Sequence, residues 1–253
     1  MRFLRETGLV FGSQLRTQLR YPLWVIIGIS QPVLYLVLFG PLLKSVAPAM
    51  GSGTDPWNVL TPALVIQIGL FGSMFAGFAM VQELRAGVIE RQRVTPASRA
   101  ALLFGRVLKD VVVLIVQALL LIAVAMAAFS LRPNPIGMIT SVLLISVMAA
   151  GLAAGSYALA LWARSEGPLA SVLNGVSVPL MLLSGILLPM SLAPQWLRII
   201  ADINPFQHTV EAARALFRGD FAVTQVYVGT GLTVAVSVGL IVLGARSFAR
   251  ENA

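Results

Sequence analysis

The sequence predicts an all-α membrane protein with about six transmembrane helices. Three observations carry this prediction. Of the 253 residues, 58% are hydrophobic and only 11% are charged, whereas a typical soluble domain carries roughly a quarter charged residues. Apolar runs of about 20 residues, the length that crosses the hydrocarbon core of a bilayer, recur along the chain. The basic residues lie between these runs, and sixteen of the eighteen are arginines. The length suits one membrane domain, residues 1–253, without a soluble domain beside it.

The first segment, residues 1–20, is expected to form an amphipathic helix at the membrane interface. On a helical wheel, its basic residues Arg2, Arg5, Arg16 and Arg20 fall on one side. The opposite side carries Leu, Phe and Val, which suits burial in the acyl boundary while the arginines face lipid phosphates. A solvated helix with some core contact is the alternative.

The six predicted spans follow in order, each long enough to cross a bilayer. Trp57 and Trp162 mark membrane interfaces, because an aromatic ring there can stay half wet. Gly151 and Gly155 lie one turn apart in the fourth span, which predicts close helix packing, either within the subunit or at a dimer seam. The predicted spans are 22–43, 57–81, 107–129, 136–162, 168–188 and 224–245.

The positions of Arg and Lys predict the orientation. With a cytoplasmic N-terminus, thirteen of the eighteen basic residues fall in cytoplasmic segments, as the positive-inside rule requires. We therefore expect both termini on the cytoplasmic side. The basic residues form no stripe suited to nucleic acid, so the bilayer surface is the expected partner.

Two connections are long enough to have roles of their own. The cytoplasmic one, about 82–106, alternates acidic and basic residues up to a break at Thr95 and Pro96, which predicts a short amphipathic helix at the membrane surface. It serves either as a positively charged anchor or as a coupling helix that inserts apolar residues into a groove on a soluble partner. The external one, about 189–223, is apolar and broken by prolines, which predicts short helices dipping partway into the bilayer.

The sequence offers little material for catalysis. Glu83, Lys109 and Asp110 are expected at the cytoplasmic ends of their helices, and Arg106 is spaced to pair with Asp110 one turn on. The span interiors then keep only neutral polar groups, which argues against a proton-driven transporter. A phosphate-binding loop needs Gly-Lys-Ser/Thr, and neither lysine follows a glycine. With no cysteine and a single histidine, His208, we expect no enzyme and no metal site.

Two segments resemble the type-2 family of ATP-binding-cassette transporter permeases, in particular its daunorubicin-resistance-like drug exporters. The first carries a glutamate at the end of the second span, then glycine, glutamate and a Thr-Pro-x-Ser-Arg run. The second carries Asn-Pro and, later, arginine and glycine. These residues are Glu83, Gly87, Glu90, Thr95, Pro96, Ser98, Arg99, Asn204, Pro205, Arg214 and Gly219. The amphipathic start, the six spans and the external half-helices also fit, so the likeness covers nearly the whole chain.

The resemblance implies a half-transporter in a bacterial inner membrane. Two permease subunits, expected to be identical, would each sit on a separate cytoplasmic ATPase that binds ATP and Mg²⁺, so this chain itself needs no cofactor. The N-terminal helix and the loop after the second span would contact the ATPase, with Arg164 and Glu166 as a minor contact. The expected coupling residues are Glu83, Arg85, Gly87, Val88, Ile89, Glu90, Arg91, Arg93, Thr95, Pro96 and Arg99.

By the same resemblance, the translocation path would lie between the two copies. Its polar candidates are Gln31, Gln67 and Asn174, and the alternative for each is an interhelical hydrogen bond. Apolar spans with few aromatic residues and no basic cavity favour a hydrophobic drug or natural product as cargo. Two alternatives stay open: a permease for a lipid-linked glycan or another envelope component, and a non-transporting membrane anchor or assembly protein.

Overall fold

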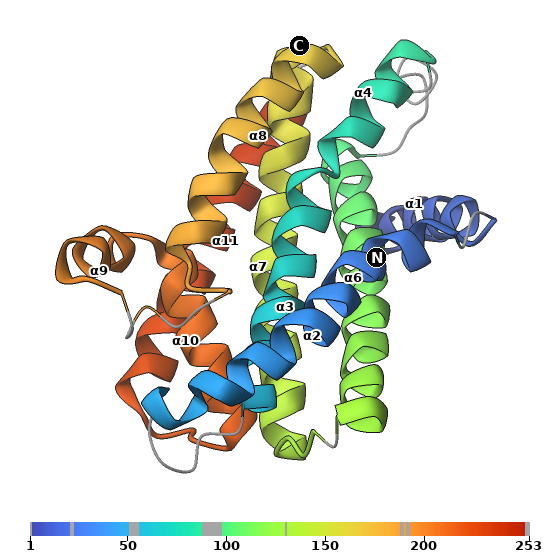
Figure 1. The fold of residues 1–253 in the computed structure, drawn as a ribbon. Coiled ribbons are helices and arrows are strands. Elements are labelled where there is room, and N and C mark those ends of the chain that lie inside the picture. Colours follow the sequence, from blue (N-terminus) through green and yellow to red (C-terminus); the bar gives the residue numbers. More distant parts are fainter. Residues whose placement is uncertain are drawn as a thin grey trace.

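The structure is a computed structural model that describes residues 2–20, 23–50, 56–87, 98–129, 131–187, 190 and 193–250. Nearly all of this described part is helical (Figure 1). Six candidate spans in it are long and apolar enough to cross a membrane. The predicted all-α membrane fold with six spans is therefore confirmed.

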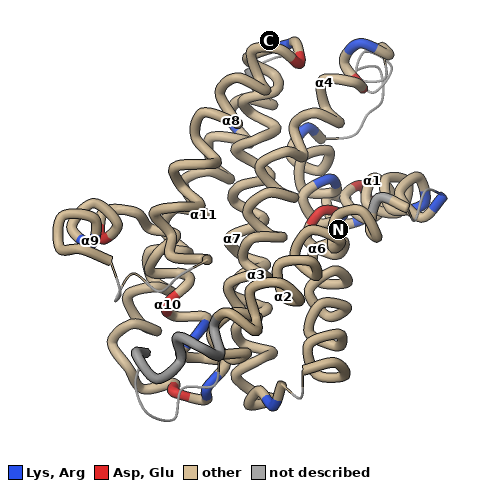
Figure 2. The backbone as a smooth tube through the Cα atoms, in the orientation of Figure 1, with Lys and Arg blue, Asp and Glu red and all other residues tan. Residues whose placement is uncertain are grey.

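The chain forms a bundle of long helices with shorter helices around its ends. The six spans are α2, α3 together with α4, α6, α7, α8 and α11. The helices are α1 (Arg2–Leu19), α2 (Leu23–Met50), α3 (Pro56–Met74), α4 (Gly77–Arg85), α6 (Arg99–Phe129), α7 (Pro135–Ala163), α8 (Glu166–Leu183), α9 (Gln195–Asp202), α10 (Pro205–Arg218) and α11 (Thr224–Arg250). Figure 2 shows charged residues at the ends of the bundle and on α1 and α9 beside it, whereas α3 and α7 carry none and α11 carries them only near its end.

The centre of the bundle is α3, which packs against α2, α6, α7 and α10. Most of its residues are buried, as expected for a helix that is apolar around its whole circumference. Figure 1 shows that α2 crosses in front of α3 at a marked tilt, while α3, α6 and α7 run side by side. The tilt of α2 brings it against both α3 and α6.

The first helix, α1, packs against the beginning of α6. A Cβ on Gly105 would lie 2.7 Å from the Cβ of Val10, so the glycine permits this close approach. The rings of Phe3 and Phe104 meet edge to face at 6.0 Å. Leu4 and Leu19 stay exposed, so part of the apolar side of α1 is uncovered in the single subunit. Its place at a membrane interface stays a prediction.

The glycines of the fourth span pack within the subunit. A Cβ on Gly151 would lie 2.5 Å from the Cα of Ser237, and one on Gly155 would lie 3.1 Å from Leu240 Cδ2. Both neighbours belong to α11, and α7 and α11 make an extensive contact. Small residues therefore let two spans approach closely, as they do between membrane helices generally. The intrasubunit interpretation of these glycines is confirmed.

The second span is interrupted between α3 and α4. The hydroxyl of Ser156, on α7, donates to the carbonyl of Met74 and accepts from the N–H of Gly77 at 2.9 Å. A Cβ on residue 77 would lie 2.6 Å from the backbone oxygen of Ser156. A side chain inserted into the hydrogen-bond ladder in this way bends a helix. Figure 1 shows the change of direction from α3 to α4.

Candidate functional site

One end of the bundle brings together predicted coupling residues from distant parts of the sequence. We call this end the coupling face and define it by α4, the beginning of α6, the turn between α7 and α8, and the end of α11. There Arg85 Nη1, on α4, lies 3.6 Å from Glu166 Oε1, at the start of α8. Both side chains are about half exposed. The predicted major and minor cytoplasmic contacts therefore lie side by side.

The coupling segment begins where α4 ends, and the residues after it contact other elements. Before it, Gly87 follows α4 with a φ of 68°, the left-handed conformation in which glycine commonly ends a helix. After it, the backbone N–H of Ser98 donates to Glu6 Oε2 of α1 at 2.8 Å. Arg99 Nη1 donates to the carbonyl of Ala249, near the end of α11, at 2.9 Å. The coupling face thus connects to both terminal helices.

The middle of the predicted coupling segment is not among the described residues. The structure therefore leaves the coupling helix itself as a prediction. The residues concerned are Val88, Ile89, Glu90, Arg91, Arg93, Thr95 and Pro96.

The turn between α7 and α8 contains the second predicted contact. Arg164 ends α7 with a φ of 52°, a left-handed conformation that is uncommon for a residue with a side chain. Its N–H donates to the carbonyl of Ala160 at 2.9 Å, which closes the last turn of the helix. This sharp reversal places Glu166 within reach of α4.

A buried charge cluster lies beneath the coupling face. Arg106, on α6, is 2% exposed, and its Nη2 lies 2.6 Å from Glu83 Oε2 of α4. Gln14 Nε2 of α1 donates to Glu83 Oε1 at 3.2 Å. Asp110 pairs with Lys109 and accepts a hydrogen bond from the hydroxyl of Tyr157 on α7. Four helices therefore meet at one set of charges.

This cluster adds one contact to the sequence prediction and corrects one position. Arg106 is spaced to pair with Asp110 on its own helix, and the structure gives it an ion pair with Glu83 that joins two helices. Arg106 and Asp110 were expected at a helix end, but they lie about two to three turns inside α6, and Arg106 is buried there. A buried charge needs an opposite charge or hydrogen bonds nearby, and here those partners come from several elements. Such contacts depend on helix packing and leave no pattern along the chain.

Two of the three predicted path residues come together in a cavity of about 190 Å³ between α2, α3 and α6. Gln31 and Gln67 line it, together with Gln117 of α6. Gln31 Nε2 donates to Tyr35 Oη at 3.1 Å, and Gln117 Nε2 donates to the carbonyl of Val25 at 3.4 Å. We call this cavity the glutamine cavity.

The third predicted path residue is elsewhere. Asn174 lies exposed on α8 and does not line the glutamine cavity. The sequence prediction did not include Gln117 among the path residues, although an amide side chain in an apolar span was a visible signal. What the sequence lacked was the rotation of each helix about its axis.

The Asn-Pro and Gly residues of the second resemblance segment form the two ends of α10. Asn204 Oδ1 accepts from the N–H of Phe206 at 3.1 Å, and Pro205 takes the first helical position, where its missing N–H does no harm. Asn204 Nδ2 also donates to the carbonyl of Leu180 at 3.2 Å, which ties this end of α10 to α8. Gly219, with a φ of 91°, ends the helix in a left-handed conformation.

The arginine of the same segment holds three elements together from a buried position. Arg214 Nε donates to the carbonyl of Val59 on α3 at 3.1 Å. Its Nη2 donates to the carbonyls of Gly185 at 2.8 Å and Ile186 at 3.3 Å, in the turn after α8. Burial lowers the pKa of Arg214 to about 10, so the group stays charged at neutral pH. The two carbonyls that Arg214 Nη2 contacts come after Leu183, the last residue of α8. The helix of the fifth span therefore ends before residue 188, where the prediction placed its end.

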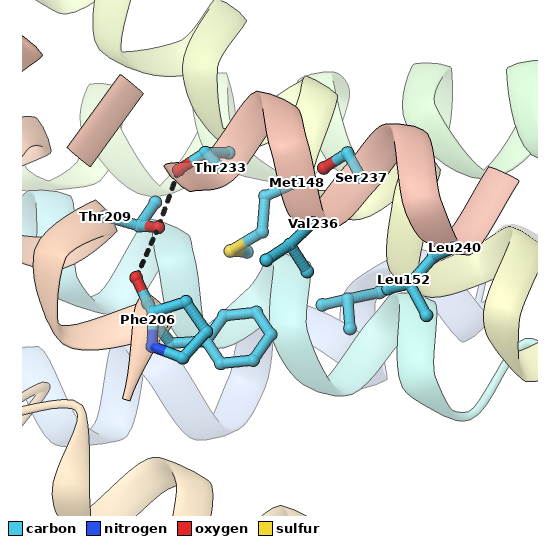
Figure 3. A pocket seen from close by; sticks show the side chains of 9 residues that line it. Met148, Leu152, Phe206, Thr209, Thr233, Val236, Ser237 and Leu240 are labelled. Atoms are coloured by element: carbon cyan, nitrogen blue, oxygen red, sulfur yellow. Dashed lines mark hydrogen bonds between the residues drawn. The ribbon is translucent and has the colours of Figure 1, made fainter. Parts of the chain in front are cut away.

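A small polar contact fastens the other side of α10 to α11 (Figure 3). The hydroxyls of Thr209 and Thr233 lie 2.7 Å apart, beside a cavity of about 10 Å³. Each hydroxyl also lies within hydrogen-bond distance of a backbone carbonyl, Thr233 of Gly229 and Thr209 of Pro205. Since a hydroxyl has one hydrogen, one threonine donates to its carbonyl and the other donates to that threonine. A space of this size holds about one water molecule and no larger ligand. It is therefore part of the packing of α10.

In the residues that the structure describes, no group of three or more His, Asp or Glu side chains is placed to hold a metal ion. The charged cluster around Arg106 contains two carboxylates and two cations that face each other.

Comparison with known proteins gives a family and several distant relatives. A family model described as ABC-2 type transporter matches residues 5–217. The chain is 28% identical over 202 residues to ycf38 of Cyanophora paradoxa, a proposed transport permease, covering 78% of this chain and 69% of that one. It is 24% identical over 239 residues to the daunorubicin resistance ABC transporter permease protein DrrB1 of Streptomyces coeruleorubidus, covering 92% of this chain and 82% of that one.

Proposed function

Because this chain belongs to the ABC-2 type transporter family, we propose that it is the membrane-spanning subunit of an ATP-driven exporter whose ATPase is a separate protein. The observation that carries the proposal is the family match over residues 5–217, which takes in most of α1, the coupling face apart from the end of α11, and five of the six spans. Permeases of this family typically work with an ATPase partner. The chain is accordingly a multi-pass membrane protein and the transport subunit of a larger complex.

The ATPase binds at the coupling face in this proposal. Arg85 and Glu166 present exposed charges of opposite sign next to each other, and Arg99 lies exposed where α6 begins. Charges at the rim of an interface select the partner and set its register. This face is then cytoplasmic, which places both termini of the chain in the cytoplasm of a bacterium. Two permease copies and two ATPase copies complete the exporter.

The bend between α3 and α4 suits transmission of movement from the ATPase. Displacing α4 acts directly on Glu83, which contacts Arg106 on α6 and Gln14 on α1. The span can flex at the point where Ser156 already replaces the helical hydrogen bonds. A push on the coupling face would thus reorient several spans together, as hinge and shear motions do in other transport proteins.

The second permease copy docks against α8. This helix leaves Val172, Val176 and Leu182 exposed, and Asn174 lies on its uncovered surface. A path between two copies would pass this surface, with hydrophobic drugs or natural products as cargo. The support for this cargo is the distant relative DrrB1, whose name records daunorubicin resistance.

The test is co-purification with a candidate cytoplasmic ABC ATPase of the same organism, followed by drug-stimulated ATP hydrolysis in lipid vesicles. The variants are Arg85→Glu and Glu166→Arg, singly and together, with Arg132→Glu as the control, since Arg132 is exposed in the turn between α6 and α7 at the opposite end. We expect each single reversal to weaken ATPase binding roughly fivefold, the double reversal to recover part of it, and the control to bind normally.

Two results would overturn the proposal. An ATPase that never associates with the wild-type chain would favour a membrane anchor. Uphill cargo movement driven by a pH gradient, with no ATPase present, would show a different energy source. Stimulation by a lipid-linked glycan and not by a drug would keep the exporter and replace the cargo.

A further inference from the structure

The glutamine cavity lies within one subunit, between α2, α3 and α6, and contains no charged residue among those that line it. Its volume is about 190 Å³. Gln31 and Gly72 are exposed at its edge, so it opens at the surface of the bundle. On the inner side, a Cβ on Gly28 would collide with Gln117 Nε2, so the glycine lets this amide reach α2. The cavity is therefore an amide-lined recess in the side of the membrane domain.

One amide in this recess has an unused acceptor. Gln67 is 2% exposed, and its Oε1 has no hydrogen-bond partner in the part of the chain that the structure describes. Buried polar atoms are nearly always paired, because an unpaired one loses its hydrogen bonds to water without replacement. A bound group with an N–H or O–H would supply the missing partner.

The rest of the lining restricts what can bind. The side-chain amide groups of Gln31 and Gln117 each donate to an acceptor within the protein, at Tyr35 and at the carbonyl of Val25. Each of these amides keeps a second N–H, so the unpaired acceptor of Gln67 is the group that a ligand hydroxyl or N–H must satisfy. The lining offers no charge to pair with an ion. Apolar side chains, among them Ile68 and Phe71, form the remaining wall. Pockets for drug-sized molecules measure roughly 300–1,000 Å³, so this recess holds one ring or head group of a larger molecule.

We propose that the glutamine cavity binds the hydroxyl-bearing head or ring of an uncharged amphiphile that enters sideways from the bilayer, with Gln67 Oε1 accepting a hydrogen bond from the hydroxyl. As a cargo subsite, it rests on the proposed export function. As a binding site, it depends on this chain alone and needs no ATPase. It also differs from a path between two subunits, because all of its lining comes from one copy.

The test uses the full chain in lipid nanodiscs and a monoacylglycerol that carries a photoreactive diazirine in its acyl chain. The matched probe is the methyl ester of the same fatty acid, which is uncharged but has no hydroxyl. We expect saturable labelling by the monoacylglycerol in peptides of α2, α3 and α6, competed by unlabelled monoacylglycerol. The methyl ester should label these peptides only weakly, because it cannot donate to Gln67.

Two variants test separately the hydrogen bond to Gln67 and the open volume of the cavity. Gln67→Leu removes the acceptor and should weaken binding roughly threefold to tenfold, the value of one neutral hydrogen bond. Gly72→Leu fills the opening, since a Cβ there meets nothing within 4 Å, and should abolish labelling. Gly231→Leu is the matched control on α11, where the glycine is likewise exposed with free space for a Cβ. It should label as the wild type does.

The outcomes also distinguish this site from the export function. Equal labelling by both probes, or unchanged affinity in both Gln67→Leu and Gly72→Leu, would overturn the site. If Gln67→Leu does not fold, Gly72→Leu alone decides. Labelling as expected without any association of an ATPase would keep the site and reject the exporter. Drug-stimulated ATP hydrolysis without labelling would keep the exporter and reject the site.

Discussion

Replacing Arg214 tests whether its geometry or its charge holds α10 in place. The lowered pKa, about 10 against an ordinary value of about 12.5, corresponds to a burial cost of about 3 kcal/mol. Against this stand three hydrogen bonds from a charged donor to the carbonyls of Val59, Gly185 and Ile186, each worth about 1.5–3 kcal/mol. Arg214→Met removes both contributions, so we expect a loss of about 3 kcal/mol in the free energy of unfolding.

The informative comparison is Arg214→Lys. A lysine keeps the charge and is hydrated more strongly than a guanidinium, so its burial costs at least as much. Its single ammonium cannot reproduce the planar fork that reaches α3 and the turn after α8 at once. We therefore expect the lysine variant to be at least as unstable as the methionine variant, although lysine is chemically closer to arginine.

Reversible unfolding in mixed micelles, followed by tryptophan fluorescence, measures these losses. Arg218→Met is the control, because Arg218 lies one turn further along α10 in a half-exposed pair with Asp220 and should contribute less than about 1 kcal/mol. Arg214 stays charged between pH 6 and pH 9 in both the folded and the unfolded chain, because its pKa is about 10 when folded and higher when unfolded. The loss should therefore be constant over that range. A lysine variant as stable as the wild type beside an unstable methionine variant would refute the reasoning.

Two further predictions concern the coupling face and the helix bend. Glu83→Gln removes the ion pair between Glu83 and the buried cation of Arg106 and should destabilise the chain by about 3 kcal/mol. Arg85→Ala breaks a half-exposed pair and should cost less than about 1 kcal/mol. Equal losses in the same unfolding assay would contradict this ranking. Ser156→Ala leaves the N–H of Gly77 and the carbonyl of Met74 without the hydroxyl and should cost about 1–3 kcal/mol. Spin labels on α4 and α7 should then report a changed distance, and an unchanged distance and stability would exclude Ser156 as the cause of the bend.

Hydropathy and local sequence signals predicted much of the fold. Lipid cannot hydrogen-bond the backbone, so each apolar run of sufficient length must become a helix whatever surrounds it. The ends of α10 were also readable, because Asn204 and Pro205 begin a helix and Gly219 ends one through contacts within a few residues. Arg85 and Glu166 were predicted as ATPase contacts from the family likeness, without any indication that they touch each other.

The contacts between spans were decided by packing alone. A span that is apolar on all sides, such as α3, has no sequence pattern that tells which side faces which neighbour. For this reason the spacing along the chain could not show that Arg106 pairs with Glu83, that Ser156 enters the ladder of α3, or that Gln117 joins Gln67 while Asn174 turns away. Each of these depends on the rotation and tilt of whole helices, which only their mutual packing sets.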